Sequence, residues 1–283
     1  MSKIPLVTLI TDFGTADGYV GAVKGVILSI APRAQVIDIS HEVAPHNVRQ
    51  AAFILHNVYP YFPPHTVHLV VVDPGVGSAR RPIALRTPAG SFVGPDNGVF
   101  SYVMAREPIE ELVVLTNPRY RLSRQSYTFH GRDIFAPAAA HLALGVPLTR
   151  LGPPVRDHCT LPLPCLEIGR ESIRGEVLHV DHFGNLITSI GVLVWCDEML
   201  ELCPAFGEGE MVRFNASSAR VKVNDTEISG VFHTYAEGAP GQPLALVGSG
   251  GYLEIAVREG SAASKLGVSV GTGVLVQFGE KLR

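Results

Sequence analysis

Apolar residues follow two spacings along the first half of the chain. Four short segments rich in β-branched residues are typical of strands: 5–11, 34–40, 66–72 and 111–116. Three longer segments repeat apolar residues at helical spacing: 17–32, 46–59 and 131–144. The segments 82–87 and 90–94 predict a hairpin, and 96–105 predicts a short helix. Strands that alternate with helices predict an α/β fold with a mostly parallel, helix-covered sheet.

The pattern changes near Pro162. The segment LGPPVRDHCTLPLPCLEIG holds four prolines in nineteen residues and predicts a linker. Beyond it, helical periodicity largely disappears and short apolar segments end in Gly or Asp, which is typical of antiparallel strands. We therefore predict an N-terminal α/β domain over residues 1–160, a linker over 161–172 and a smaller, mainly antiparallel β domain over 173–283.

Composition limits the classes of function. The chain has 283 residues, 46% hydrophobic and 17% charged, which is enough apolar material for a sizeable core. The net charge of −3 gives no reason to expect nucleic acid or an anionic membrane as a partner. No apolar run approaches the roughly 20 residues of a membrane span, and the first run of about seven residues is too short for a signal sequence. We therefore expect a cytoplasmic protein.

The four cysteines show no metal-binding or redox spacing. Cys159, Cys165, Cys196 and Cys203 include no C-x-x-C pair, so we expect reduced cysteines that pack in the fold. The eleven histidines show no H-x-x-H or H-E-x-x-H spacing either. The chain also lacks a P-loop, a G-x-S-x-G elbow and a G-x-G-x-x-G turn. We predict that the protein needs neither a metal nor a cofactor.

Three carboxylates stand at or near predicted strand ends. Asp12, Asp38 and Asp73 belong to LITDFG, VIDIS and VVVDPG. Ligands of open parallel sheets bind beyond the carboxyl ends of the strands, and the glycines after Asp12 and Asp73 let the backbone approach a ligand closely. The ordinary alternative for each carboxylate is a turn or a helix N-cap.

The stretch VDPGVGSARR places two arginines soon after the third of these carboxylates. Asp73 and Arg80 can pair across the PGVGSA loop, which keeps the carboxylate ionised, whereas Arg81 is expected in solvent. His130 precedes a predicted helix in FHGRDIFAP, where it can orient or deprotonate a small nucleophile. The alternatives are an ion pair that fixes the loop and a histidine that caps the helix.

Two stretches of the second half suggest a ligand that carries both an amino acid and a nucleoside. DHFGN, from Asp181 to Asn185, combines a carboxylate, a ring and an amide. GSGGYLEIAV begins with residues 248–251, whose backbone N–H groups can hold a carboxylate. Two ordinary β-turns remain the alternative.

Six motifs in order together resemble one family: TLITDFGTADGYVGAVKG, VVVDPGVGSARRPI, VGPDNGVF, FHGRDIFAPAAAHLA, DHFGNLITSI and GSGGYLEIAVREGSAASKLG. They are similar to the S-adenosylmethionine hydroxide adenosyltransferases, which are related to the 5′-fluorinase and the 5′-chlorinase. The resemblance implies a mixed α/β N-terminal domain followed by a smaller C-terminal β-barrel domain. It also implies a homotrimer whose ligand lies between the N-terminal domain of one subunit and the C-terminal domain of the next. The implied reaction hydrolyses S-adenosylmethionine at C5′ to adenosine and L-methionine.

The resemblance also implies a role for individual residues. Asp73, Arg80 and His130 correspond to the hydrolase triad. The substrate-binding roles fall on Asp12 for the ribose hydroxyls, Phe183 and Tyr235 for the faces of the adenine, Asn185 for its edge, Asp181 for the methionine ammonium and Ser249 for the methionine carboxylate. The chain departs from the halogenases at Gly250, where they have an arginine, and at His46, where they have a tryptophan.

The substrate itself suggests the mechanism. A sulfonium is already a good leaving group, so the protein has to align the water and exclude solvent rather than supply an acid. We expect Asp73 mainly to orient the water and His130 to accept its proton. The alternatives are a 5′-halogenase, whose halide a charged Asp73 would repel, a protein that binds S-adenosylmethionine without turnover, and a methyltransferase.

Overall fold

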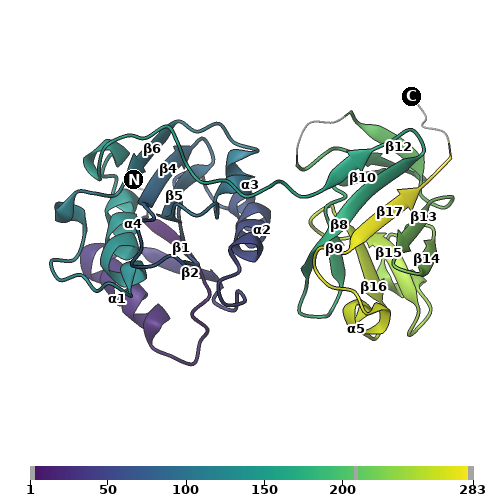
Figure 1. The fold of residues 1–283 in the computed structure, drawn as a ribbon, viewed down its shortest axis with the longest axis horizontal. Helices are drawn as coiled ribbons and strands as arrows, with labels where there is room; N and C mark the ends of the chain where they lie inside the picture. Colours follow the sequence, from purple (N-terminus) through teal and green to yellow (C-terminus); the bar gives the residue numbers. More distant parts are fainter. Residues whose placement is uncertain (1–3, 207–209, 280–283) are drawn as a thin grey trace. The chain divides into compact units, whose positions relative to one another are not determined.

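The computed structural model describes residues 4–206 and 210–279, and the chain forms two compact units, Met1–Pro162 and Leu163–Arg283 (Figure 1). Each unit has a hydrophobic core of its own. The two units are therefore described one at a time.

A six-stranded sheet forms the centre of the first unit, in the order β2-β1-β3-β5-β4-β6. Its strands are β1 (Leu6–Thr11), β2 (Gln35–Ser40), β3 (Val67–Val71), β4 (Pro82–Thr87), β5 (Gly90–Pro95) and β6 (Glu111–Val114). The strands β2, β1, β3 and β5 pair in parallel, whereas β4 runs antiparallel to β5 and β6. The predicted mostly parallel sheet and the predicted hairpin are both confirmed.

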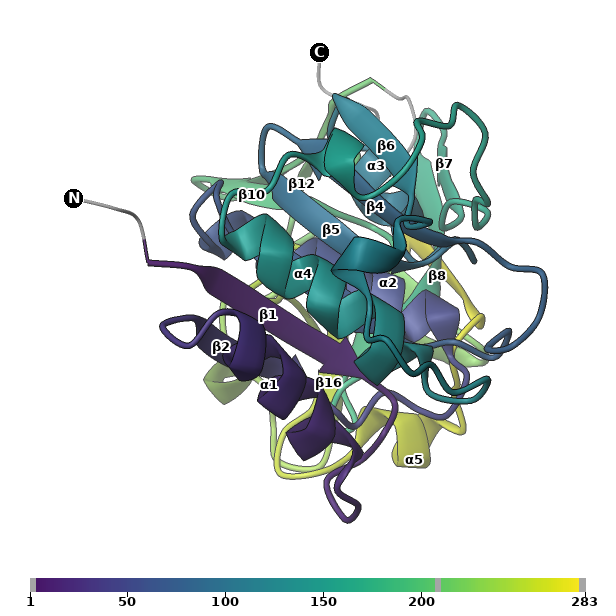
Figure 2. The ribbon, with the colours of Figure 1, turned by 90° about the vertical axis from the view of Figure 1, so that its left-hand side faces the viewer.

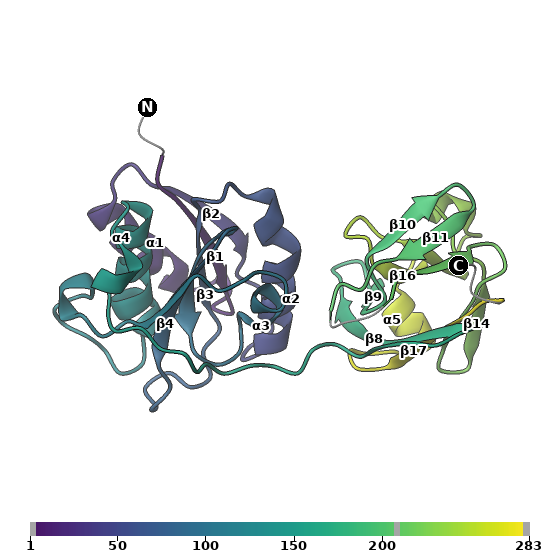
Figure 3. The ribbon, with the colours of Figure 1, turned by 90° about the horizontal axis from the view of Figure 1, so that it is seen from above.

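Helices cover both faces of this sheet. They are α1 (Tyr19–Ile30), α2 (Val48–Val58), α3 (Ser101–Met104) and α4 (Ala136–Ala143). Figures 2 and 3 show α1 and α4 on one face and α2 and α3 on the other. Short helical turns complete the unit: η1 (Tyr59–Tyr61), η2 (Pro118–Tyr120), η3 (Gly131–Phe135) and η4 (Leu148–Arg150). Within residues 4–206 and 210–279, no helix has the length and apolar character needed to cross a membrane.

The central strands are apolar on both sides because both sides are covered. Leu9 and Leu69 pack in the core beneath α1 and α4, while Ile10 and Val70 pack in the core beneath α2. Successive side chains of a strand point to opposite faces, so one continuous apolar strand serves both cores. Burial of each such side chain contributes about 1.5–3 kcal/mol, which holds the strand ends that carry the site in place.

The helix predicted over 131–144 is a π-helix followed by an α-helix. The π-helix η3 covers Gly131–Phe135, and α4 begins at Ala136 with Pro137 in its first turn. Proline has no backbone N–H, so an α-helical ladder cannot continue unbroken through this position. The irregular turn lies directly after His130.

The second unit is a nearly closed β-barrel. Its strands are β7 (Leu166–Ile168), β8 (Ser172–Val180), β9 (Leu186–Thr188), β10 (Leu193–Cys196), β11 (Met199–Leu202), β12 (Val212–Asn215), β13 (Arg220–Val223), β14 (Thr226–Ser229), β15 (Pro243–Val247), β16 (Leu253–Val257) and β17 (Gly273–Gln277). The main sheet follows the order β14-β13-β17-β8-β9-β16-β15 with antiparallel pairing, and β14 and β15 at its two ends lie near each other (Figure 1). Two short helices, η5 (Tyr235–Glu237) and α5 (Ala262–Leu266), lie between strands.

Two features of this unit were not predicted. A separate sheet, β10-β11-β12, arises from strands of four residues each, which are too short for a clear alternation of apolar and polar residues. In addition, β7 lies within the segment 161–172 that the prolines marked as a linker, and it pairs with β8. That end of the segment is therefore part of the sheet of the second unit.

The expectation of reduced cysteines that pack in the fold holds only in part. All four cysteines are free thiols, but Cys159 and Cys196 are exposed and Cys165 and Cys203 are half-buried. The spacing of the cysteines along the sequence carried no information about their burial.

Candidate active site

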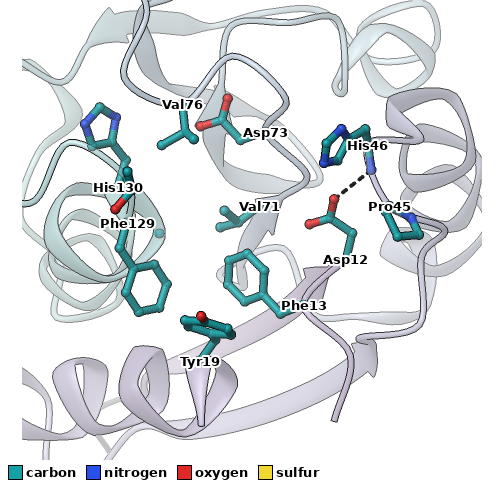
Figure 4. Close-up of a pocket in the computed structure, with 12 residues that line it drawn as sticks. Asp12, Phe13, Tyr19, Pro45, His46, Val71, Asp73, Val76, Phe129 and His130 are labelled. Carbon is teal, nitrogen blue, oxygen red and sulfur yellow. Dashed lines mark hydrogen bonds between the residues drawn. The ribbon is translucent and has the colours of Figure 1, made fainter. Parts of the chain in front are cut away.

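A pocket of about 300 Å³ lies at the carboxyl ends of β1 and β3 in the first unit (Figure 4). Asp12 follows the end of β1 directly, and Asp73 stands two residues beyond β3. Both line the pocket, together with His130 from the segment before η3. The structure therefore brings together three of the residues that the sequence singled out, at the sheet edge where parallel strands place ligands.

Asp73 and Arg80 form a buried ion pair beside this pocket. Arg80 Nε donates to Asp73 Oδ1 at 2.9 Å and Oδ2 at 3.0 Å, and Arg80 Nη2 also donates to Oδ2. The two side chains are only 6% and 9% exposed, and the guanidinium lies 5.0 Å from the centre of the Phe135 ring. The predicted pairing across the PGVGSA loop is confirmed, and its hydrogen bonds join two groups of opposite charge.

The loop between Asp73 and Arg80 requires a glycine at position 77. Gly77 has a φ of +78°, and a Cβ built there would lie 2.7 Å from the backbone oxygen of Tyr127. The loop therefore packs directly against the segment that leads to His130. On its other side, Asn97 Nδ2 donates to the carbonyl oxygen of Val72 at 2.9 Å, which holds the backbone next to Asp73.

His130 completes the group. Arg80 Nη2 lies 2.9 Å from His130 Nδ1, and because a guanidinium has only donors, Nδ1 must accept this bond. The neutral imidazole therefore carries its proton on Nε2. Burial, followed by the charge of Arg80, lowers the pKa of His130 below its usual value, which favours this neutral form.

The expectation that Arg81 is solvated is wrong. Its guanidinium donates to Asp96 Oδ2 at 2.9 Å from Nε and 2.6 Å from Nη2, and its Nη1 donates to Asp157. The other oxygen of Asp96 accepts the backbone N–H of Cys159. Arg81 thus ties the start of β4 to the segment around 157–159.

Asp12 organises a loop as well as facing the pocket. Its Oδ2 accepts the backbone N–H of His46 at 2.8 Å, which Figure 4 shows as the dashed line. His46 has a φ of +68°, a conformation that costs a non-glycine residue about 1 kcal/mol or more. Asp12 therefore stabilises the strained turn that places His46 on the pocket wall. Its Oδ1 makes no other hydrogen bond among the described residues.

Asp38, the third strand-end carboxylate, does not reach this pocket. It lies within β2, where Lys24 Nζ donates to Oδ2 at 2.5 Å and His41 Nε2 lies 3.0 Å from Oδ1. The hydrogen bonds from Lys24 and His41 lower the pKa of Asp38 against the opposing effect of burial. Its role in the structure is an ion pair on the edge strand of the sheet.

Sequence reasoning missed an aromatic wall. The rings of Phe13, Tyr19 and Phe129 contact one another at centroid distances of 5.3–6.0 Å and line the pocket on the side away from Asp73 (Figure 4). Phe13 follows the end of β1, Tyr19 is the first residue of α1, and Phe129 directly precedes His130. The aromatic neighbours of Asp12 and His130 in DFG and TFHG were the available signal.

In the second unit, Asp181 and its neighbours form a tight turn. Asp181 Oδ1 accepts the backbone N–H groups of Phe183 and Asn185 at 2.9 and 2.8 Å, and its Oδ2 accepts Asn185 Nδ2 at 3.0 Å. This is the ordinary turn that the sequence left open as an alternative. It also leaves the Phe183 ring 74% exposed, so the turn presents an aromatic face to solvent.

The other predicted residues of the second unit lie near a carboxylate that the sequence did not single out. Tyr235 begins η5, and its hydroxyl donates to Glu254 Oε1 at 2.5 Å. Ser249 is exposed at the tip of the turn between β15 and β16. The signal for Glu254 was a single acidic residue in the apolar strand YLEIAV.

Across residues 4–206 and 210–279, no group of three or more His, Cys, Asp or Glu side chains could hold a metal ion. The roles that the resemblance gave to the nine residues stay predictions.

Comparison with known proteins relates the whole chain to one family. Residues 7–152 match the SAM hydroxide adenosyltransferase N-terminal domain, and residues 175–275 match the C-terminal domain of the same family. The (R)-S-adenosyl-L-methionine hydrolase of Salinispora arenicola is 41% identical, over 99% of this chain and 100% of its own length. A fluorinase of an Actinoplanes species is 27% identical over 96% of this chain and 97% of its own. The crystal structure of an uncharacterised conserved protein from Thermotoga maritima has a TM-score of 0.83 at 37% identity, and the match covers 96% of this chain and 99% of that one.

Proposed function

The chain belongs to the SAM hydroxide adenosyltransferase family, and we propose that Asp73, Arg80 and His130 align the water molecule with which it hydrolyses S-adenosyl-L-methionine. The water attacks C5′ of the substrate, and the products are adenosine and L-methionine. The observation that carries the proposal is the buried Asp73–Arg80 pair, bonded to His130 at the pocket. A carboxylate in this position favours water as the nucleophile, because it would repel a halide ion.

The reaction needs little acid or base strength. As the bond between C5′ and the water oxygen forms, the C5′–S bond breaks and its electron pair remains on sulfur, which gives the neutral thioether of methionine. The attacking water becomes an oxonium, a far stronger acid than a carboxylic acid. The Asp73 carboxylate is therefore basic enough to take up the proton, and alignment provides most of the catalysis.

His130 acts as a donor in this proposal. Its Nδ1 already accepts a hydrogen bond from Arg80, so the remaining nitrogen of the neutral ring carries a proton. We assign His130 to orienting the water through Nε2–H, in place of the proton-accepting role that the sequence favoured. Arg80 in turn holds both partners of the water, Asp73 and His130, through one guanidinium.

The substrate-binding roles remain as the resemblance gave them. Asp12 has Oδ1 available for the ribose hydroxyls, since Oδ2 holds the His46 N–H. In the second unit, the rings of Phe183 and Tyr235 are both exposed and suited to stack on adenine. The proposed partners are the methionine ammonium for Asp181, the adenine edge for Asn185 and the methionine carboxylate for Ser249. The proposed location is the cytoplasm.

Hydrolysis at C5′ predicts a specific pattern of products. Wild-type protein incubated with S-adenosylmethionine, chloride and a chelator in ¹⁸O-labelled water is expected to release adenosine and methionine in equal amounts, with the label in the 5′-hydroxyl group. Chromatography with mass spectrometry measures this. Halo-adenosine, S-adenosylhomocysteine or unchanged substrate would support a halogenase, a methyltransferase or a binding protein instead. Activity that a chelator abolishes and a divalent ion restores would contradict the proposal that no metal is needed.

We also propose that the protein is a homotrimer whose sites combine the first unit of one subunit with the second unit of its neighbour. The support is the resemblance and the division of the predicted binding residues between the two units. Such sharing predicts complementation between two inactive variants, Asp73→Asn and Asp181→Ala.

Mixed trimers of these variants, formed by co-expression in equal amounts, are expected to regain about one third of the wild-type activity, because in a ring of three subunits either mixed composition leaves about one site in three with both intact halves. The measurement is turnover per subunit after both tagged chains have been co-purified. Each variant purified alone provides the baseline. Activity of the mixture equal to the average of the two variants would place each complete site within one chain.

A further inference from the structure

Glu254 is a buried carboxylate outside the set of residues that the reaction has so far required. It lies in β16 between neighbours of an apolar strand and is only 6% exposed. The pKa of Glu254 is raised: burial raises it most, the hydrogen bond from Tyr235 opposes this effect, and the negative charge of Asp181 raises the pKa further. Burial of a carboxylate costs free energy that one hydrogen bond from a tyrosine only partly offsets, so Glu254 contributes little to the stability of the barrel.

One oxygen of Glu254 anchors an exposed ring. Tyr235 is 44% exposed and belongs to a three-residue helix on the loop between β14 and β15. Its hydroxyl donates to Glu254 Oε1 at 2.5 Å, which makes a strong, charge-assisted hydrogen bond from a loop residue to a rigid strand. Thr234 and Glu237 hold the two ends of the same helix through reciprocal hydrogen bonds. The backbone of Tyr235 is thus fixed by the capping box and its ring by Glu254.

The other oxygen of Glu254 lies against the turn that carries Ser249. A Cβ built on Gly248 would lie 2.5 Å from Glu254 Oε2. A side chain at position 248 would therefore displace this oxygen, so the observed position of the carboxylate depends on a glycine there. One buried group contacts both the ring predicted to stack on adenine and the turn predicted to hold the methionine carboxylate.

We propose that Glu254 is a positioning residue that holds the Tyr235 ring at the angle required to stack on the adenine of the substrate. The proposal rests on the proposed function, because it takes the adenine as the ligand of Tyr235. Glu254 acts through the Tyr235 hydroxyl and does not touch the substrate. A ring that is already anchored loses less side-chain entropy on binding than a free exposed tyrosine does.

The test is a double-mutant cycle read by adenosine binding. Calorimetry is performed on the wild type, Tyr235→Phe, Glu254→Leu and the double variant. Loss of the anchoring bond is expected to weaken adenosine binding about tenfold in each single variant. Because both substitutions remove the same bond, the double variant is also expected to bind about tenfold more weakly than the wild type, not a hundredfold. Glu254→Gln keeps an acceptor oxygen for the hydroxyl and is expected to retain the affinity within about threefold.

Two further variants separate positioning from folding. Gly248→Ala pushes on Oε2 without changing Glu254 and is expected to weaken adenosine binding as well. Glu227→Leu, at an exposed position of β14, is the control that should leave adenosine binding unchanged. With S-adenosylmethionine, Glu254→Leu is expected to raise KM about tenfold and to change kcat by less than about threefold, since the water-aligning groups lie in the other unit.

If the affinity losses of the two single variants multiply in the double variant, the proposal is overturned. Normal adenosine binding by Tyr235→Phe would also overturn it. A lower kcat at unchanged KM would also overturn it. If Glu254→Leu does not fold, Tyr235→Phe, Glu254→Gln and Gly248→Ala still decide the question. Binding of adenosine requires no turnover, so a wild type that binds adenosine but leaves S-adenosylmethionine intact would refute the proposed function while the cycle still tests Glu254.

Discussion

Replacement of Asp73 by Asn is expected to lower the turnover of S-adenosylmethionine by roughly 10²–10³, equivalent to about 3–4 kcal/mol of transition-state stabilisation. The amide has nearly the same volume as the carboxylate, so the fold should survive. The substitution removes the negative charge that we propose orients the water and takes up its proton. The affinity for the substrate should change little, because its binding groups are predicted on other residues.

Single-turnover kinetics measure the chemical step of Asp73→Asn, and calorimetry measures its affinity for S-adenosylmethionine. The matched control is Asp157→Asn, which removes an exposed carboxylate from the neighbouring Arg81 and should leave the rate unchanged. If Asp73 only fixes the loop, the variant should lose thermal stability, and its rate and affinity should decline together. Wild-type turnover in Asp73→Asn would remove this residue from the mechanism.

Replacement of Arg80 by Met is expected to reduce both turnover and stability. The Asp73 carboxylate, 6% exposed, would lose its ion pair, and removal of one partner from a buried pair typically costs about 3–5 kcal/mol. Turnover should fall by at least roughly 10²-fold, because the guanidinium positions Asp73 and His130 together. Urea denaturation measures the free energy of unfolding, and the same kinetic assay measures the rate.

The double variant Asp73→Asn/Arg80→Met separates the two effects. Without the unpaired carboxylate, it should regain much of the stability that Arg80→Met lost, but none of the turnover. Arg80→Lys keeps a positive charge without the planar fork and should recover stability better than rate. Full activity in Arg80→Lys would show that charge alone is sufficient and would contradict the positioning role of the guanidinium.

Local patterns in the sequence were enough for the architecture of the first unit. The buried strands were recognisable because residues such as Leu9, Ile10, Leu69 and Val70 are apolar on both faces, as a helix-covered sheet requires. The barrel was predicted less completely. Strands as short as β10 (Leu193–Cys196) contain too few residues for a period of two to be distinct.

The Asp73–Arg80 pair could be predicted for a related reason. The two residues are seven positions apart on one glycine-rich loop, so the chain itself brings them close. The placement of Asp12 and Asp73 at one sheet edge also followed from the sequence, because parallel strands put their carboxyl ends on the same side. Asp38, in contrast, lies inside its strand, and the boundary of that strand was not visible in the pattern.

What the sequence determined by itself was therefore local: the strands, the helices and the ion pair across a short loop. The tertiary structure alone decided the proton position on His130, the bonds of Arg81 and the anchoring of Tyr235 by Glu254. These pairs join residues 50, 76 and 19 positions apart. The physical reason is that contacts over such separations depend on strand order and core packing. The same histidine, arginine or glutamate pattern is compatible with a solvent-facing side chain until the fold supplies its partner.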